Sequence, residues 1–166
     1  FQLNRCYRTT IEVIDYANDI LRKYFPKDYK LPEAVLRHGA DVKEINSRDI
    51  NKVLENEIEK GSTTIALICK DEVESNKLYE DLKQRDFKKP VYTYSDSDYN
   101  TGILVLPIRK AKGLEFDSVI VYNSQNYNFD KEVDVREFYV GVTRALHRLY
   151  IHTNEWENRK NNFYCI

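Results

Sequence analysis

The chain has 166 residues, of which 42% are hydrophobic and 32% are charged, so it can bury one hydrophobic core and has an ordinary globular composition. Lys and Arg number 26 against 27 Asp and Glu, and the net charge of -1 excludes a global positive field; any contact with nucleic acid must therefore use a local basic patch. No apolar run reaches the roughly 18 residues of a membrane-spanning helix and no signal peptide is visible, so we expect no membrane partner.

The cysteines Cys6, Cys69 and Cys165 are odd in number, widely spaced and without a CxxC pair. This usage argues against a disulfide framework and a zinc site, so we predict no metal centre and a reducing, cytoplasmic environment. Because the sequence does not begin with methionine, we also expect it to be a piece of a larger protein.

Four segments carry apolar residues at helical spacing together with start or stop signals. Thr9-Thr10-Ile11-Glu12 has the form of a capping box, and the helix that it starts should end before Pro26. The second helix should run from a cap at Asn46 or Ser47 to Gly61, with its charged residues on a solvated face. The third is expected from a cap at Asp71 with Glu74 to about Arg85, and the fourth from about Val135 to Leu146.

Five short apolar runs read as strands, and a sixth candidate lies at 34–37. The five are Thr64–Cys69, Val91–Tyr94, Ile103–Leu106, Ser118–Tyr122 and Leu149–Ile151. Strands and helices alternate along the chain, which predicts an α/β fold with a parallel sheet and helices on its faces. Residues 95–102 are polar and turn-rich, and we expect a plain loop there.

A basic segment, Pro107–Gly113, lies between the apolar runs Ile103–Leu106 and Ser118–Tyr122. It contains Arg109, Lys110, Lys112 and Gly113. In an open α/β sheet, ligands bind outside the carboxyl ends of the strands, and a basic loop there suits phosphate. Gly113 permits a positive φ or a close backbone approach. The alternative is a solvated crossover with scattered lysines.

Tyr7 and Arg8 come just before the first predicted helix. An anion near a helix N-terminus gains from the free N–H groups and the helix dipole. The alternative for Arg8 is a surface arginine that pairs with Glu12.

Three segments resemble motifs of the UvrD/Rep-type superfamily 1 helicases, in the order in which that family has them. Ala111–Asp117, AKGLEFD, is similar to motif V. Phe138–Ala145, FYVGVTRA, is similar to motif VI. Cys6–Thr10, CYRTT, is similar to motif IV, with Cys6 where Asn is usual.

The resemblance implies a RecA-like fold, in which helices cover both faces of a parallel sheet in three layers. The chain would be the second, C-terminal RecA-like domain (2A), with residues 1–152 as the domain and 153–166 as a tail. The family's large inserted subdomain is absent, since its place is taken by the short polar loop at 95–102.

The resemblance also implies roles for single residues. Arg8 and Arg144 would be catalytic and contact the γ-phosphate of ATP. Tyr7 would stack on the adenine. Glu115 would bind the ribose or link the cleft to the neighbouring domain, and Gly113 would shape the same nucleotide-binding loop.

Arg109, Lys110 and Lys112 would touch the backbone of single-stranded DNA. The family often has Thr and His at the positions of Pro107 and Arg109, so the sequence departs from the pattern at this point.

ATP is the implied cofactor, but the chain contains no GxxxxGK[ST] to cradle its phosphates. A missing N-terminal RecA-like domain would supply that loop and hold Mg²⁺, so we expect the fragment alone to be inactive. An arginine placed at a γ-phosphate stabilises the spread charge of the transition state.

The leading interpretation is the second motor domain of an ATP-dependent DNA helicase or translocase. One alternative is a helicase-like remodeller that recycles RNA polymerase. Another is a non-catalytic RecA-like module that only binds protein. The expected partners are the N-terminal RecA-like domain and single-stranded DNA, with RNA polymerase under the first alternative.

Overall fold

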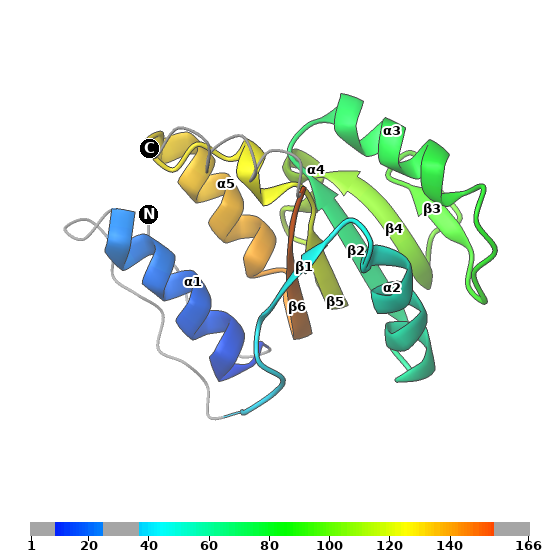
Figure 1. Cartoon of the computed structure of the whole chain (residues 1–166), viewed down its shortest axis with the longest axis horizontal. Coiled ribbons are helices and arrows are strands. Elements are labelled where there is room, and N and C mark those ends of the chain that lie inside the picture. Colours follow the sequence, from blue (N-terminus) through cyan, green and yellow to red (C-terminus); the bar gives the residue numbers. More distant parts are fainter. Residues whose placement is uncertain (1–8, 25–36, 155–166) are drawn as a thin grey trace.

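A computed structural model describes residues 9–24 and 37–154, and within them six strands form one sheet in which every pairing is parallel (Figure 1). The order across the sheet is β1-β6-β5-β2-β4-β3. The strands are β1 (Lys43–Asn46), β2 (Thr64–Cys69), β3 (Val91–Thr93), β4 (Gly102–Pro107), β5 (Phe116–Val121) and β6 (Ala145–Thr153). The predicted α/β fold with a parallel sheet is confirmed.

Helices cover both faces of this sheet (Figure 1). The helices are α1 (Ile11–Tyr24), α2 (Ile50–Glu59), α3 (Glu72–Leu82), α4 (Ile108–Ala111) and α5 (Glu132–Val142), with a 3₁₀ turn η1 (Ser124–Asn126). One core lies between the sheet and α1, α4 and α5, and the other between the sheet and α2 and α3. Neighbouring residues of β2 point to opposite cores, Ala66 to the first and Leu67 to the second, because side chains alternate along a strand.

The predicted cap of α3 is confirmed, whereas that of α2 is wrong. The carboxylate of Asp71 accepts from the backbone N–H of Glu74 at 2.8 Å, and α3 then ends at Leu82 instead of near Arg85. Helix α2 begins after Asp49, since Asn46 is occupied as the last residue of β1 and in the turn that follows. The sequence did not predict β1, a short edge strand in which only Ile45 is buried.

Helix α1 starts at Ile11, but Thr9 and Glu12 do not form the predicted capping box. The hydroxyl of Thr9 donates to the carbonyl of Ala145 at 2.5 Å, and Glu12 accepts from the N–H of Gly39 at 2.8 Å. Both side chains thus contact distant parts of the chain. Pro26 and most of the candidate strand at 34–37 lie outside the described residues.

The predicted fourth helix is too long at its C-terminal end. Helix α5 stops at Val142 and β6 already begins at Ala145, so Leu146 lies in the strand. The hydroxyl of Thr143 donates to the carbonyl of Tyr139 at 2.9 Å, which satisfies a backbone group in the last turn. Beyond it, pairing of β6 with both β5 and β1 outweighs the helical spacing of Leu146.

The expected plain loop joins β3 to β4 through residues 94–101, so the inserted subdomain is absent. Tyr99 in this loop packs edge-on against Tyr92, with ring centroids 5.7 Å apart. The loop is therefore fastened to the sheet by its own aromatic side chains.

Candidate nucleotide-facing edge

The structure divides the basic segment between two edges of the sheet. Because β4 and β5 are both parallel to β2, the chain must return from the carboxyl end of β4 to the amino end of β5. Arg109 and Lys110 lie in α4, directly after the carboxyl end of β4. Gly113 lies at the amino edge, where the strands begin, so the expectation that the basic segment lies at the carboxyl ends is wrong for this residue. Glu115 also lies at the amino edge.

Arg144 lies at the same amino edge, between α5 and β6. Its Nε donates to the carbonyl of Val140 at 3.1 Å, and its Nη1 donates to the carbonyl of Leu114 at 3.3 Å. Its Nη2 donates to the hydroxyl of Thr143 at 3.3 Å. Among the described residues none of these bonds goes to a carboxylate, so the positive charge of Arg144 is held in place by neutral groups and is not neutralised.

Hydrogen bonds to backbone carbonyls join the three motif-like segments at this edge. The N–H of Phe116 donates to the carbonyl of Arg144 at 2.9 Å, which links the motif V-like and motif VI-like segments. The bond from Thr9 to Ala145 links the motif IV-like segment to them. Tyr7 and Arg8, which precede Thr9 in the sequence, lie outside the described residues.

Gly113 adopts φ +81°, and a Cβ placed on it would meet nothing within 4 Å. The glycine is therefore needed for its backbone conformation and not for close approach. The next residue, Leu114, is 42% exposed, and Glu115 is exposed as well. In this turn the carbonyl of Leu114 thus faces Arg144, whereas the side chains of Leu114 and Glu115 are exposed at the surface.

The three cations of the basic segment are exposed. Arg109 is 85% exposed, and its Nε lies 3.8 Å from Oε1 of Glu137, a distance typical of a weak surface pair. Lys110 and Lys112 are also exposed. Buried Ile108 and Ala111 anchor α4 beneath them, and a Cβ on Gly141 of α5 would come within 3.2 Å of Ile108, so this glycine lets α4 pack closely.

The carboxyl edge of the sheet differs from the amino edge because its central cation is paired. Lys70, directly after β2, donates to the carboxylate of Asp134 at 2.6 Å and to the carbonyl of Asn126 at 2.7 Å. Burial acts to raise the pKa of Asp134, but the bonds from Lys70 and from the N–H of Asn128 lower it below its usual value. The charge of Lys70 is thus already satisfied within the domain.

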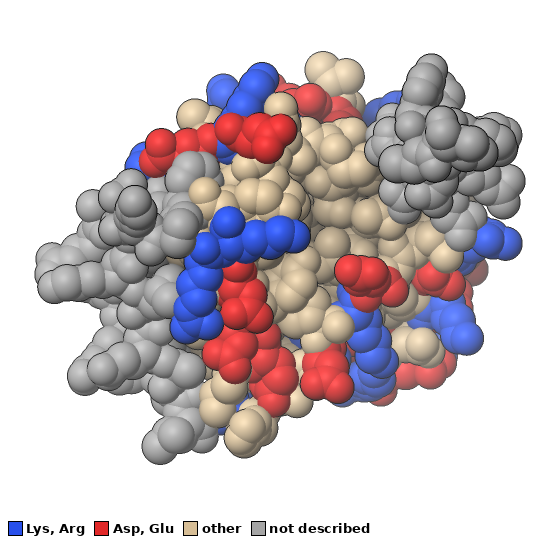
Figure 2. Space-filling view, turned by 60° about the vertical axis from the view of Figure 1, so that its left-hand side comes forward, with Lys and Arg blue, Asp and Glu red and all other residues tan. Residues whose placement is uncertain are grey.

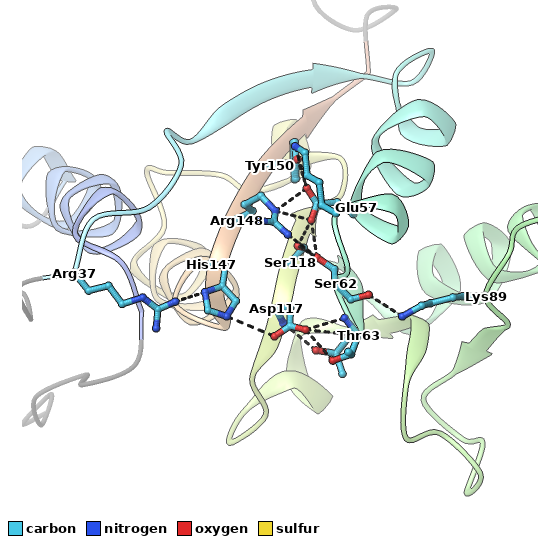
Figure 3. A network of polar contacts seen from close by, with 12 residues as sticks. Arg37, Glu57, Ser62, Thr63, Lys89, Asp117, Ser118, His147, Arg148 and Tyr150 are labelled. Carbon is cyan, nitrogen blue, oxygen red and sulfur yellow. Dashed lines mark hydrogen bonds and ion pairs between the residues drawn. The ribbon is translucent and has the colours of Figure 1, made fainter.

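A buried polar network was not predicted from the sequence (Figure 3). Its centre is Glu57 of α2, which is 0% exposed and accepts hydrogen bonds from four side chains. The donors are Arg148 at 2.7 Å, Ser62 at 2.8 Å, Tyr150 at 2.5 Å, and Ser118. Burial alone would raise the pKa of Glu57, but these bonds together lower it. The prediction that the charged residues of this helix form a solvated face is therefore wrong for Glu57.

The same network continues to the surface through Asp117 (Figure 3). Its carboxylate accepts from the N–H and the hydroxyl of Thr63, both at 2.8 Å, and lies 3.7 Å from Nε2 of His147. Arg37 contacts the other ring nitrogen of His147. The pKa of His147 is lowered, first by burial and then by the positive charge of Arg37.

Charges are mixed on the face shown in Figure 2, where basic and acidic side chains both lie around an uncharged central area. The described residues contain no group of three or more His, Cys, Asp or Glu side chains arranged to hold a metal ion. None of their helices has the length and apolar character needed to cross a bilayer.

A comparison with known protein families found a match that includes the residues at this edge. Residues 91–156 match the family model of the UvrD-like helicase C-terminal domain. This part of the chain is therefore similar to that family. The matched range contains the motif V-like and motif VI-like segments, and the motif IV-like segment precedes it.

The whole fold also resembles a solved structure, the C-terminal domain of a possible DNA helicase from Lactobacillus plantarum WCFS1. The two are 27% identical with a TM-score of 0.67, over 89% of this chain and 87% of that chain. The expected RecA-like fold is thereby confirmed. A search of curated proteins gave no match.

Of the residues predicted from the sequence, the structure brings Gly113, Glu115 and Arg144 to one edge of the sheet and leaves Arg109 and Lys110 nearer the other. The residues that sequence reasoning missed are Glu57 and its donors. One signal was available: Glu57 lies seven positions after Ile50 and three after Leu54, on the apolar stripe of α2, where a charged residue needs an internal partner.

Proposed function

We propose that this domain is the second motor domain of an ATP-dependent superfamily 1 DNA helicase or translocase. ATP would lie between its amino edge and an N-terminal RecA-like domain that carries the phosphate-binding loop and holds Mg²⁺. The match of residues 91–156 to the family model of the UvrD-like helicase C-terminal domain supports the helicase role. The cysteine usage favours a cytoplasmic location.

The observation that carries the proposal is that the guanidinium of Arg144 donates hydrogen bonds only to neutral groups among the described residues. A guanidinium that is tethered to carbonyl groups, without a carboxylate partner among the described residues, keeps its full charge for an incoming anion. Its flat fork can bind two phosphate oxygens at once and does not lose its proton. We assign Arg144 the γ-phosphate, where an arginine stabilises the charge that develops in the transition state.

The remaining nucleotide contacts are assigned by the resemblance. Arg8 would be the second γ-phosphate arginine, and Tyr7 would stack on the adenine. Glu115 would bind the ribose or the neighbouring domain from the turn that Gly113 shapes. The bond from Thr9 to Ala145 supports this grouping, since it holds the start of α1 against the segment that carries Arg144.

Arg109, Lys110 and Lys112 would bind the backbone of single-stranded DNA. Their exposure and the weak pairing of Arg109 leave their charges accessible to phosphates. Since α4 packs against α5, whose C-terminal end lies two residues before Arg144, a shift of α4 on binding DNA would reach the nucleotide edge through a packed helix. The cleft would close around ATP and open after hydrolysis. The domain would then bind the DNA strand tightly and weakly in alternation.

The test is the ATPase rate of the full-length protein with and without single-stranded DNA. Strong stimulation by DNA supports the motor, and strand-displacement assays would follow. ATPase activity indifferent to DNA would favour the remodeller, with RNA polymerase as the next addition. Absence of ATPase activity would contradict the proposal and leave a protein-binding module.

A further inference from the structure

A bulge interrupts the pairing of the two strands that carry the nucleotide-facing residues. Phe116 pairs with Ala145, but the next pair is Ser118 with Arg148. Between these pairs β5 has one residue, Asp117, whereas β6 has two, Leu146 and His147. A bulge adds one unpaired residue, bends its strand and redirects neighbouring side chains, and bulges are frequent beside active sites.

The amino side of this bulge carries Arg144. The N–H of Phe116 holds the carbonyl of Arg144, and the hydroxyl of Thr9 holds the carbonyl of Ala145. Any slip of β6 by one residue would move both bonds and carry Arg144 away from Leu114. The position of Arg144 therefore depends on what fixes the register at the bulge.

The carboxyl side of the bulge is fixed by Glu57. Ser118 and Arg148, the first pair after the bulge, both donate to its carboxylate, and they come from the two different strands (Figure 3). Ser62, two residues before the start of β2, donates to the same oxygen as Arg148, at 2.8 Å. One buried carboxylate thus binds β5, β6 and the approach to β2 at the level of the bulge.

We propose that Glu57 is a positioning residue for the nucleotide edge: it locks the bulge between β5 and β6 and thereby sets where Arg144 points. This inference rests on the proposed function. Glutamate is required because four donors converge on its two oxygens, and Arg148 is a donor that cannot accept. A glutamine would turn an NH₂ group toward donors and could not satisfy the set.

The alternative is that Glu57 only stabilises the fold and has no effect on Arg144. Two variants, each of which removes one hydrogen bond to Glu57, distinguish these possibilities. Ser118→Ala removes a donor at the bulge. Tyr150→Phe removes a donor from the same carboxylate, but Tyr150 pairs with Ile120, farther from the bulge. Both changes should lower the melting temperature, and we expect only Ser118→Ala to disturb Arg144.

The first readout needs no enzymatic activity. In the 166-residue chain, the NMR signal of the Arg144 Nε–H is assigned by its loss in Arg144→Lys. We expect this signal and the amide signals of Leu114 and Phe116 to shift in Glu57→Gln and Ser118→Ala. They should stay in place in Tyr150→Phe and in Glu59→Gln, a matched charge removal at an exposed position of the same helix.

The second readout is steady-state ATPase activity of the full-length protein, at a temperature where each variant is folded. Glu57→Gln and Ser118→Ala should lower kcat by about 10-fold or more with little change in KM, as expected when a catalytic group is misplaced by about 1 Å. Should Glu57→Gln not fold, Ser118→Ala alone decides the matter. Unchanged Arg144 signals in the folded variants overturn the proposal whether or not the wild-type protein hydrolyses ATP; an inactive wild type with shifted signals overturns only the proposed function.

Discussion

The guanidinium of Arg144 donates a hydrogen bond to the backbone carbonyl of Leu114, 3.3 Å away, across 30 residues of sequence. This bond joins the end of α5 to the exposed turn before β5, so two segments that resemble separate helicase motifs act as one surface. The arginine is held by neutral acceptors and keeps its positive charge, which it needs in order to bind a phosphate.

Replacing Arg144 with alanine should depress turnover and spare nucleotide binding. In the full-length protein we expect Arg144→Ala to lower kcat by about 10³-fold, because the arginine would act on charge that develops only in the transition state. ATP affinity, measured by fluorescence of a nucleotide analogue, should stay close to that of the wild type.

Arg136→Ala is the matched control for that experiment. Arg136 lies on α5, the helix that precedes Arg144, and forms an exposed pair with Glu132, so its loss should leave kcat unchanged. Normal turnover in Arg144→Ala would contradict the role given to this arginine.

Gly113→Ala should cost stability and also disturb the site. The residue has φ +81°, where a side chain costs about 1 kcal/mol or more, although the space for a Cβ is free. Gly61→Ala is a matched control, since Gly61 has φ +86° and equally free space but lies between α2 and β2. Chemical denaturation should show similar losses in the two variants.

Only Gly113→Ala should then reduce the ATPase rate of the full-length protein, because only that turn presents Leu114 to Arg144. Equal ATPase rates in both variants would mean that the conformation of the turn is irrelevant to the reaction.

Much of the fold could be predicted from local patterns. The apolar runs of β2, β4 and β5 are buried on both faces, so their sequences have the continuous hydrophobic character of parallel strands. The cap formed by Asp71 was predicted as well, because it depends on residues three positions apart. These features are decided by neighbours in the sequence.

The features that were missed depend on distant partners. β1 is an edge strand with a single buried side chain, so it has no apolar run to recognise. Leu146 fits the helical spacing, and only the pairing of β6 places it in a strand. Glu57 lies on the apolar stripe of α2, but its partners Ser118 and Arg148 come from β5 and β6. Sequence periodicity can indicate that Glu57 needs an internal partner, but it does not identify which residues donate to it.

Removing Lys110 and Lys112 together should weaken binding of single-stranded DNA. Both side chains are exposed on α4 and the residue after it. If each neutralises one phosphate, the slope of log K against log salt should fall by about 0.7 per lysine. Titrations of the full-length protein at several salt concentrations measure this slope.

The control for those titrations is the double variant Lys52→Ala with Lys77→Ala, which removes two exposed lysines from α2 and α3 on the opposite face of the sheet. Its salt slope should equal that of the wild type. A Lys110 and Lys112 variant with an unchanged slope would remove α4 from the DNA-binding surface.

Acid should destabilise the domain through His152, which is fully buried near the carboxyl end of β6. Its Nδ1 accepts from the N–H of Asn123 at 2.9 Å, and its ring stacks on Tyr122 with centroids 4.5 Å apart. Nε2 lies 3.1 Å from the hydroxyl of Ser47, so the neutral ring with the proton on Nε2 satisfies both bonds. A second proton on Nδ1 would face the N–H of Asn123.

Burial lowers the pKa of His152 from 6.5 to about 4, against the opposing effect of Asp49. The unfolded chain therefore binds this proton at a higher pH than the native state does, and stability rises with pH between the two values. We expect the free energy of unfolding to be fully retained above pH 6.5 and to fall below it by up to about 1.4 kcal/mol per pH unit until about pH 4.

Urea denaturation at pH 7, 6 and 5.5 measures this slope above the range in which ordinary carboxylates titrate. His152→Gln removes the titrating group and should flatten the slope, leaving the smaller contribution of His147, whose pKa is also lowered. His38→Gln is the control, because it removes a histidine whose side chain is 82% exposed instead of buried. A full slope that persists in His152→Gln would show that the acid sensitivity comes from another group.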